Sequence, residues 1–166
     1  MEIRKCENDK DVQELATLAS QIWNEYFINI ITQEQIDYMV EKFQSYKALH
    51  NAIEYENYTY FLAYENDKMI GFCGVKPDGE RLFLSKLYLH SDYRGKGYSS
   101  ILLRKAIAFA KELNKNAIYL TCNKFNTHSL DVYKKKGFST IDAVQTDIGR
   151  GFIMDDYIMQ LDIEAQ

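Results

Sequence analysis

The chain has 166 residues and a formal net charge of −4, a length that suits one domain over residues 1–166 with a sizeable core. The negative balance argues against nonspecific nucleic-acid binding, which requires a basic face. No apolar run approaches the length of a membrane span, and the acidic first residues are not a signal segment. The three cysteines show no metal-ligand spacing and predict reduced thiols in a cytoplasmic protein.

The first part of the chain alternates a short strand with two helical patterns. Glu2–Cys6 is predicted to be a strand, and Asn8 or Asp9 caps a helix whose apolar positions continue to Trp23. Thr32 and the glutamine three residues later predict a capping box for a second helix. That helix continues or restarts through Ala48–Tyr55.

Three strands are predicted next, at Tyr58–Tyr64, Met69–Val75 and Arg81–Leu89, joined by polar turns at 65–68 and 77–79. The remaining elements alternate helix and strand before two closing strands. They are a helix over Ser99–Leu113, a strand at Ala117–Cys122, a helix over Asn126–Lys136, and strands at Phe138–Asp147 and Phe152–Ile163.

The junction between the strand Arg81–Leu89 and the long helix is rich in glycine. Gly95 and Gly97 permit a tight turn, and Arg94 and Lys96 add positive charge. A helix that begins at such a turn presents unpaired N–H groups and the positive end of its dipole to an anion. The junction therefore predicts a site for a phosphate-bearing ligand, and an ordinary glycine-containing turn is the alternative. No Gly-Lys-Ser/Thr ends the loop, which excludes a Walker A motif.

Two motifs in the right order carry a family resemblance. Read as Arg94-x-x-Gly97-x-Ser99, the loop resembles the R/Q-x-x-G-x-G/A signature of the GCN5-related N-acetyltransferases (GNAT), with Ser99 in place of Gly or Ala. The segment from Asn126 through Tyr133 to Phe138 resembles the family's N-x-x-[SA]-x-x-x-Y-x-x-x-G-F pattern. The resemblance is detailed over 83–138 and coarse elsewhere.

The resemblance implies a fold and a co-substrate. The fold is α/β (α+β), a single domain with a mixed, twisted sheet of about seven strands flanked by about four helices. The co-substrate is acetyl-CoA. Its pyrophosphate would lie on the loop amides, and its pantetheine arm would pair with a strand backbone between two parallel strands that splay apart. The residues implied in cofactor binding are Leu87, Tyr88, Leu89, Arg94, Gly95, Lys96, Gly97, Tyr98, Ser99, Ser100 and Asn126.

The resemblance also implies that Tyr133 acts as general acid toward the leaving thiolate, while an amine attacks directly in a ternary complex. Some relatives place a glutamate base five residues before the motif asparagine, and here that position is Thr121. The motif therefore does not identify the general base, and a chain of water molecules to bulk solvent is the alternative to a side chain. The conceivable side chains are Glu80, His90, His128, Asp142, Asp147, Asp155 and Asp156.

The expected acceptor is the primary amine of a small molecule, with no nucleic-acid or membrane partner; a homodimer is left open. Asp155 and Asp156 indicate a cationic amine, and a solvated strand end is the alternative. A polyamine, an amino acid, an aminoglycoside and a protein N-terminus remain equally compatible. Other residues could reach the pocket, namely Trp23, Tyr26, Phe27, Tyr38, Phe43, Phe83, Lys86, Tyr88 and Tyr157. A catalytically idle acyl-CoA-binding or protein-interaction module on the same fold is the other functional class.

Overall fold

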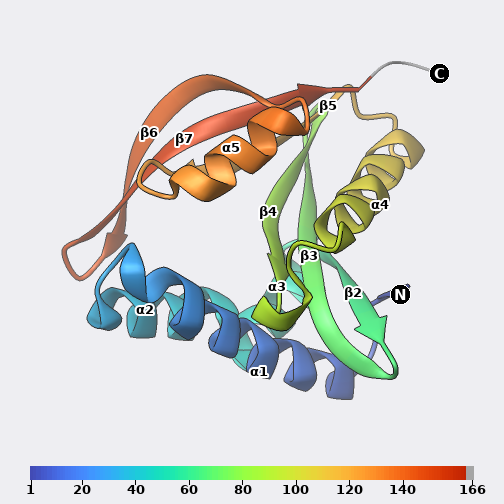
Figure 1. Ribbon diagram of the computed structural model, residues 1–166, viewed down its shortest axis with the longest axis horizontal. Coiled ribbons are helices and arrows are strands. Elements are labelled where there is room, and N and C mark those ends of the chain that lie inside the picture. The colour runs from blue at the N-terminus through green and yellow to red at the C-terminus, as the bar shows by residue number, and fades with distance from the viewer. Residues whose placement is uncertain (164–166) are drawn as a thin grey trace.

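A computed structural model describes residues 1–163 and shows a seven-stranded mixed sheet in the order β1-β2-β3-β4-β5-β7-β6 (Figure 1). All neighbouring strands are antiparallel except β4 and β5, which are parallel. One face packs on α1 and α3, and the other packs on α4 and α5. This arrangement confirms the predicted mixed sheet flanked by helices.

The N-terminal half contains three helices and three strands. Their bounds are β1 (Glu2–Lys5), α1 (Asp9–Tyr26), α2 (Gln33–Met39), α3 (Tyr46–Tyr55), β2 (Thr59–Glu65) and β3 (Lys68–Asp78). Side-chain caps fix the helix starts: the side chains of Asn8, Thr32 and Ser45 each accept a backbone N–H of the first turn. The second helical segment restarts, because a π-helical turn over Val40–Gln44 separates α2 from α3.

The C-terminal half follows the predicted order. Its elements are β4 (Arg81–Leu89), α4 (Tyr98–Glu112), β5 (Ala117–Asn123), α5 (Thr127–Lys135), β6 (Ser139–Gly149) and β7 (Phe152–Asp162). One expected turn is wrong: β3 continues through Pro77 to Asp78, opposite Leu82 and Arg81 of β4. The chain reverses at residues 79–80, where Gly79 has a φ of +58°.

The parallel pair β4 and β5 separates along its length. Their residues pair only at the start, where Arg81–Phe83 lies opposite Ala117–Tyr119. Beyond Phe83 the β5-facing edge of β4 has no strand partner, and the register of β3 with β4 shifts between Gly74 and Val75. A bulge increases the local twist of a sheet, which helps the two strands to diverge. The predicted splay of Arg81–Leu89 from Ala117–Cys122 is confirmed.

The tip of the β6–β7 hairpin is attached to α2. Tyr38 Oη donates a hydrogen bond of 2.6 Å to the carbonyl of Ile148, and the Tyr38 ring stacks on Phe152 at 5.2 Å. Ile148 also packs in a cluster with Trp23 and Met39. In Figure 1 the hairpin arches from the sheet down to α2. The contact brings β7 and the first two helices together around the space beside β4.

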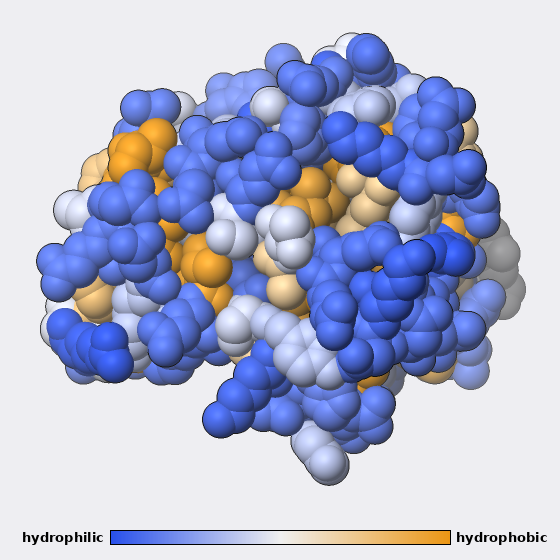
Figure 2. Space-filling view, turned by 90° about the horizontal axis from the view of Figure 1, so that it is seen from below, coloured by the Kyte–Doolittle hydropathy of each residue, from blue (hydrophilic) through white to orange (hydrophobic). Residues whose placement is uncertain are grey.

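The face seen from below is mainly hydrophilic, with separate hydrophobic patches (Figure 2).

Candidate functional site

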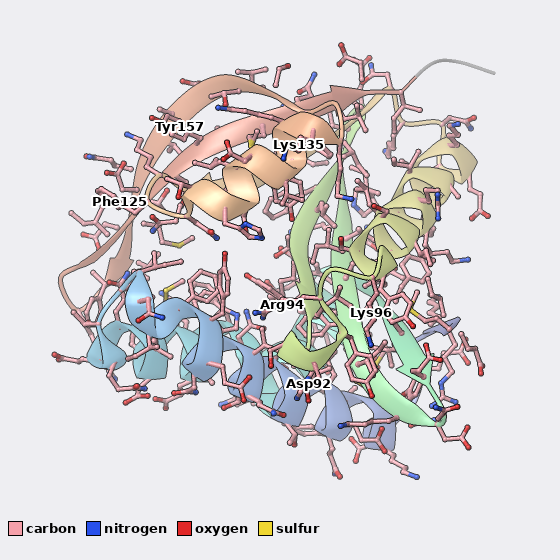
Figure 3. The ribbon with its side chains drawn as sticks, in the orientation of Figure 1. Asp92, Arg94, Lys96, Phe125, Lys135 and Tyr157 are labelled. Carbon is pink, nitrogen blue, oxygen red and sulfur yellow. The ribbon has the colours of Figure 1, made fainter. Side chains whose placement is uncertain are left out.

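A cavity of about 850 Å³ opens where β4 and β5 diverge. Its walls come from both splayed strands, the loop before α4, and the helices α1, α2 and α5, with β7 at one side. Most residues predicted for the site line it: Leu87, Tyr88, Leu89, Arg94, Gly95, Gly97, Ser99, Ser100, Asn126 and Tyr133. Lys96 and Tyr98 do not line it. In Figure 3 Arg94 lies near the middle of the view and Lys96 farther toward β2 and β3.

The glycine loop ends in an open helix N-terminus. Gly97 is the N-cap of α4 with φ 82° and ψ 4°, a left-handed conformation that favours glycine, and no side chain caps the helix. The first backbone N–H groups of this helix therefore have no intrahelical acceptor. A Cβ at Gly95 or Gly97 would meet no heavy atom within 4 Å, so the space above the loop is open. The loop can accept an anion at its backbone.

Positive side chains surround this helix start. Lys136 Nζ, at the end of α5, hydrogen-bonds Ser100 Oγ in the first turn of α4. Burial, and then the charge of Arg104, lowers the pKa of Lys136. Arg94 is held by the Leu89 carbonyl, to which its Nη2 donates at 3.1 Å. This end of the cavity can accept an anionic group.

Asn126 is both a helix cap and a cavity residue. Its Oδ1 accepts hydrogen bonds from Tyr26 Oη at 2.6 Å and from the Ser129 amide at 3.4 Å. The Tyr26 ring lies under Arg94, with the guanidinium carbon 5.0 Å from the ring centroid. The Asn126 amide is thus fixed between α1 and α5. This orientation leaves its Nδ2 donor without a partner among residues 1–163.

Tyr133 lines the same cavity from the next turns of α5, as the seven-residue spacing from Asn126 predicts. Burial raises its pKa above the ordinary value, so the phenol stays protonated at neutral pH. Its hydroxyl makes no hydrogen bond within residues 1–163. The hydroxyl is therefore available to donate a hydrogen bond to a ligand in the cavity.

Cys122 also lines the cavity but is poorly suited to attack a thioester. Burial, followed by the charge of Asp156, raises the pKa of this thiol to about 12. Because the thiolate is the nucleophile, almost none of it is present at neutral pH. The thiol of Cys122 is therefore a poor nucleophile at neutral pH.

One end of the cavity, where the C-terminal end of α1 meets β4, is aromatic. Trp23 stacks on Phe27 at 4.1 Å between ring centroids, and Tyr88 packs edge-on at 6.1 and 6.2 Å from them. Of the residues proposed for the acceptor pocket, five line the cavity: Trp23, Tyr26, Phe27, Tyr88 and Asp156. Six do not line it: Tyr38, Phe43, Phe83, Lys86, Asp155 and Tyr157.

The lining residues that the sequence analysis missed include Ile31, Gln35, Met39 and Met154. Met39 belongs to the apolar stripe of α2, which reads equally well as core. Met154 lies on β7, a strand whose place beside α2 depends on the hairpin contact. Alternation along β7 could have indicated that Met154 and Asp156 share a face.

The adjacent acids Asp155 and Asp156 separate in the structure. Asp155 forms an ion pair of 2.9 Å with Lys124 and lies outside the cavity. Asp156 is 5% exposed and lines the cavity opposite Asn123 of β5. Successive residues of a strand face opposite sides, which explains the separation. Burial, and then the charge of Asp155, raises the pKa of Asp156 to about 6.

Among the proposed bases, only His128 and Asp156 line the cavity within the described chain; Thr121, at the family's glutamate position, also lines it. His90 is instead fixed beside Gln21, with its Nε2 3.0 Å from the glutamine nitrogen. Asp142 and Asp147 are exposed and accept backbone N–H groups of their own strand. Asp156 is the most buried of the candidate carboxylates.

A cavity between splayed parallel strands, with an anion-binding helix start at one end and a phenol at its wall, defines a CoA-dependent acyltransferase site. Residues 18–138 match the acetyltransferase (GNAT) family. The chain belongs to this family and is an N-acetyltransferase with acetyl-CoA as its co-substrate.

Relatives and solved structures agree with this assignment. The chain is 28% identical over 159 residues to the spermidine N(1)-acetyltransferase of Thermoplasma acidophilum, covering 93% of this chain and 96% of the relative. It is 25% identical to mouse N-acetyltransferase 8B over 75% of this chain and 52% of that protein.

The fold superposes on PaiA N-acetyltransferase from Thermoplasma acidophilum in complex with coenzyme A, with a TM-score of 0.81 and 22% identity over 98% of this chain and all of that one. The fold also superposes on ribosomal-protein-alanine N-acetyltransferase from Brucella melitensis, with a TM-score of 0.73 and 18% identity over 98% of this chain and 100% of that one. Within residues 1–163, no helix has the length and apolar character needed to cross a membrane.

Proposed function

We propose that the chain acetylates a primary amine of a small molecule by direct attack in a ternary complex, with Tyr133 as general acid. The observation that carries the proposal is the protonated, unpartnered hydroxyl of Tyr133 on the wall of the cavity where β4 and β5 diverge. The name of the Thermoplasma relative, a spermidine N(1)-acetyltransferase, supports an amine acceptor.

The cofactor arm follows the cavity from the loop to Tyr133. The open N-terminus of α4 binds the pyrophosphate, with Lys136 adding positive charge. The backbone of Leu87–Leu89, on the unpaired edge of β4, pairs with the pantetheine amides. Asn126 donates to the same arm through its free Nδ2. These contacts hold the thioester beside the acceptor end.

One general acid, Tyr133, is enough to balance the protons of the chemical step. The lone pair of the neutral amine forms the C–N bond at the thioester carbon, and the C–S bond breaks with its electrons on sulfur. Tyr133 gives its proton to that thiolate, and the proton lost by the new amide nitrogen restores the phenol. The free, buried state of Cys6, Cys73 and Cys122 supports a reducing, cytoplasmic setting for this reaction.

Tyr133→Phe tests the proposal, because it removes the acidic hydroxyl and keeps the ring that packs on Phe138. We expect turnover to fall on the order of 10²-fold or more, the usual size of general acid catalysis. Acetyl-CoA affinity, measured by calorimetry, should change little. Wild-type turnover under conditions where chemistry limits the rate would remove Tyr133 from the mechanism.

A panel of amines assayed by free-thiol release separates the enzyme from an idle module. An idle acyl-CoA-binding protein would bind acetyl-CoA and release no thiol with any amine. Acetylation restricted to peptides with free N-termini would contradict the small-molecule acceptor.

A further inference from the structure

We propose that the acceptor carries a single ammonium group next to an apolar or aromatic body, that Asp156 binds this ammonium and takes its proton, and that the aromatic end of the cavity holds the body. The inference rests on the proposed acetyl transfer and assigns the substrate class and a further catalytic residue. It depends on three features of the cavity, taken in turn below.

The first feature is a buried carboxylate without a protein partner. Asp156 is 5% exposed, lines the cavity, and forms no side-chain hydrogen bond or ion pair within residues 1–163. A buried charged group costs free energy unless it is paired. Its neighbour Asp155 is paired with Lys124 at 2.9 Å, so that cation is already engaged on the other side of the strand. An ammonium group of the substrate would supply the missing partner of Asp156.

The second feature is the apolar wall around the same end of the cavity. Trp23 of α1 and Phe27, which directly follows α1, stack with 4.1 Å between ring centroids, Met39 comes from α2, and Met154 lies two residues before Asp156 on β7. Residues two apart on a strand share a face, so Met154 and Asp156 border one space. Aromatic and thioether side chains favour an apolar or aromatic ligand group.

The third feature is the count of charges on the cavity wall. Within the described chain, Asp156 is its one carboxylate, and the cationic side chains Arg94 and Lys136 are hydrogen-bonded to the Leu89 carbonyl and to Ser100 Oγ. A polyamine would bring two or more further ammonium groups into this space. Those groups would lose hydration without gaining a carboxylate, and they would meet the apolar wall. A singly charged amine matches the wall better than spermidine does.

Asp156 would also start the reaction. Its carboxylate takes one proton from the bound ammonium, and the freed lone pair of the amine attacks the thioester carbon. After the C–S bond breaks and Tyr133 protonates the sulfur, the proton on Asp156 passes to solvent. The net reaction converts ammonium and thioester into amide, thiol and one proton.

Charged and titratable groups near Asp156 also affect its pKa. Lys124 lowers its pKa and Asp155 raises it, while Cys122 from β5 and Tyr88 from β4 also lie within its electrostatic reach. Burial dominates and brings the pKa to about 6, so the group is ionised at neutral pH and still basic enough to accept a proton.

The test compares Asp156→Asn with the matched control Asp155→Asn on 2-phenylethylamine and spermidine. For wild type we expect kcat/KM to be higher with 2-phenylethylamine than with spermidine. We also expect this kcat/KM to rise with pH through about 6. Asp156→Asn should lower kcat/KM for the amine on the order of 10²-fold and remove that rise. Asp155→Asn should keep kcat/KM near wild type at neutral pH, and neither variant should change the affinity for acetyl-CoA. Asp156→Glu should keep the pH-dependent rise.

Each other outcome counts against a specific step. An Asp156→Asn enzyme with wild-type KM and pH profile overturns the role of Asp156, and a preference for spermidine overturns the substrate class. In both cases the proposed acetyl transfer stands, because an amine is still acetylated. Acetyl-CoA binding without acetylation of any amine overturns the proposed function, and this inference with it.

Discussion

Asp156 should make the native state less stable at neutral pH, and Asp156→Asn should reveal by how much. Burial raises the pKa of this carboxyl from 3.8 to about 6. Between these two values the folded protein keeps the proton, while the unfolded chain has lost it. Stability therefore falls as pH rises from about 4 to about 6 and stays lower above that window, by the linkage of protonation to folding.

A shift of roughly two pKa units corresponds to about 3 kcal/mol at 1.36 kcal/mol per unit. Residual exposure and the nearby Lys124 reduce this figure, so we expect about 1–3 kcal/mol. The asparagine variant lacks this titration. Its free energy of unfolding, relative to wild type, should rise by that amount between pH 4 and pH 7. Urea unfolding across this range measures the difference, provided that the m-values agree.

Parallel stability curves for the two proteins would refute the reasoning, since they would mean that the Asp156 carboxyl titrates alike in the folded and unfolded chains. The prediction also distinguishes a functional group from a structural one. A variant that is more stable and less active identifies a charge retained for its chemistry.

Three further substitutions test the loop, the hairpin and the nucleophile. Gly97→Val places a branched side chain at a φ of +82° above the open helix start, and should weaken acetyl-CoA binding in calorimetry while the fold persists; unchanged affinity in a folded variant would contradict the anion site. Gly149→Ala brings a Cβ within 2.7 Å of Tyr38 Oη and should lower the free energy of unfolding, measured with urea, by about 1–3 kcal/mol. Gly151→Ala is the control and should cost less, because its Cβ meets no heavy atom within 4 Å. Equal costs would show that the hairpin contact contributes little to stability. Cys122→Ser should leave turnover near wild type in the thiol-release assay, and its loss would revive an acetyl-cysteine route.

Short-range sequence signals account for the local features of the fold. Glycines at 95 and 97, followed by an amphipathic pattern, require a tight turn into a helix whatever the rest of the fold does. The spacing of Asn126 and Tyr133 puts both on one face of a helix, and both line the cavity. Caps and periodicity gave the order of strands and helices because these signals act over a few residues.

Only the tertiary structure decided which acid belongs to the site. Asp155 and Asp156 are chemically identical neighbours, and strand alternation alone does not say which face of β7 is covered. The answer depends on β7 lying between β5 and β6 and on its hairpin reaching α2, where Tyr38 holds Ile148. The strand through Pro77 and the π-helical turn that ends α2 were decided in the same way. Pairing partners and packing, which are distant in sequence, override short-range propensity at such positions.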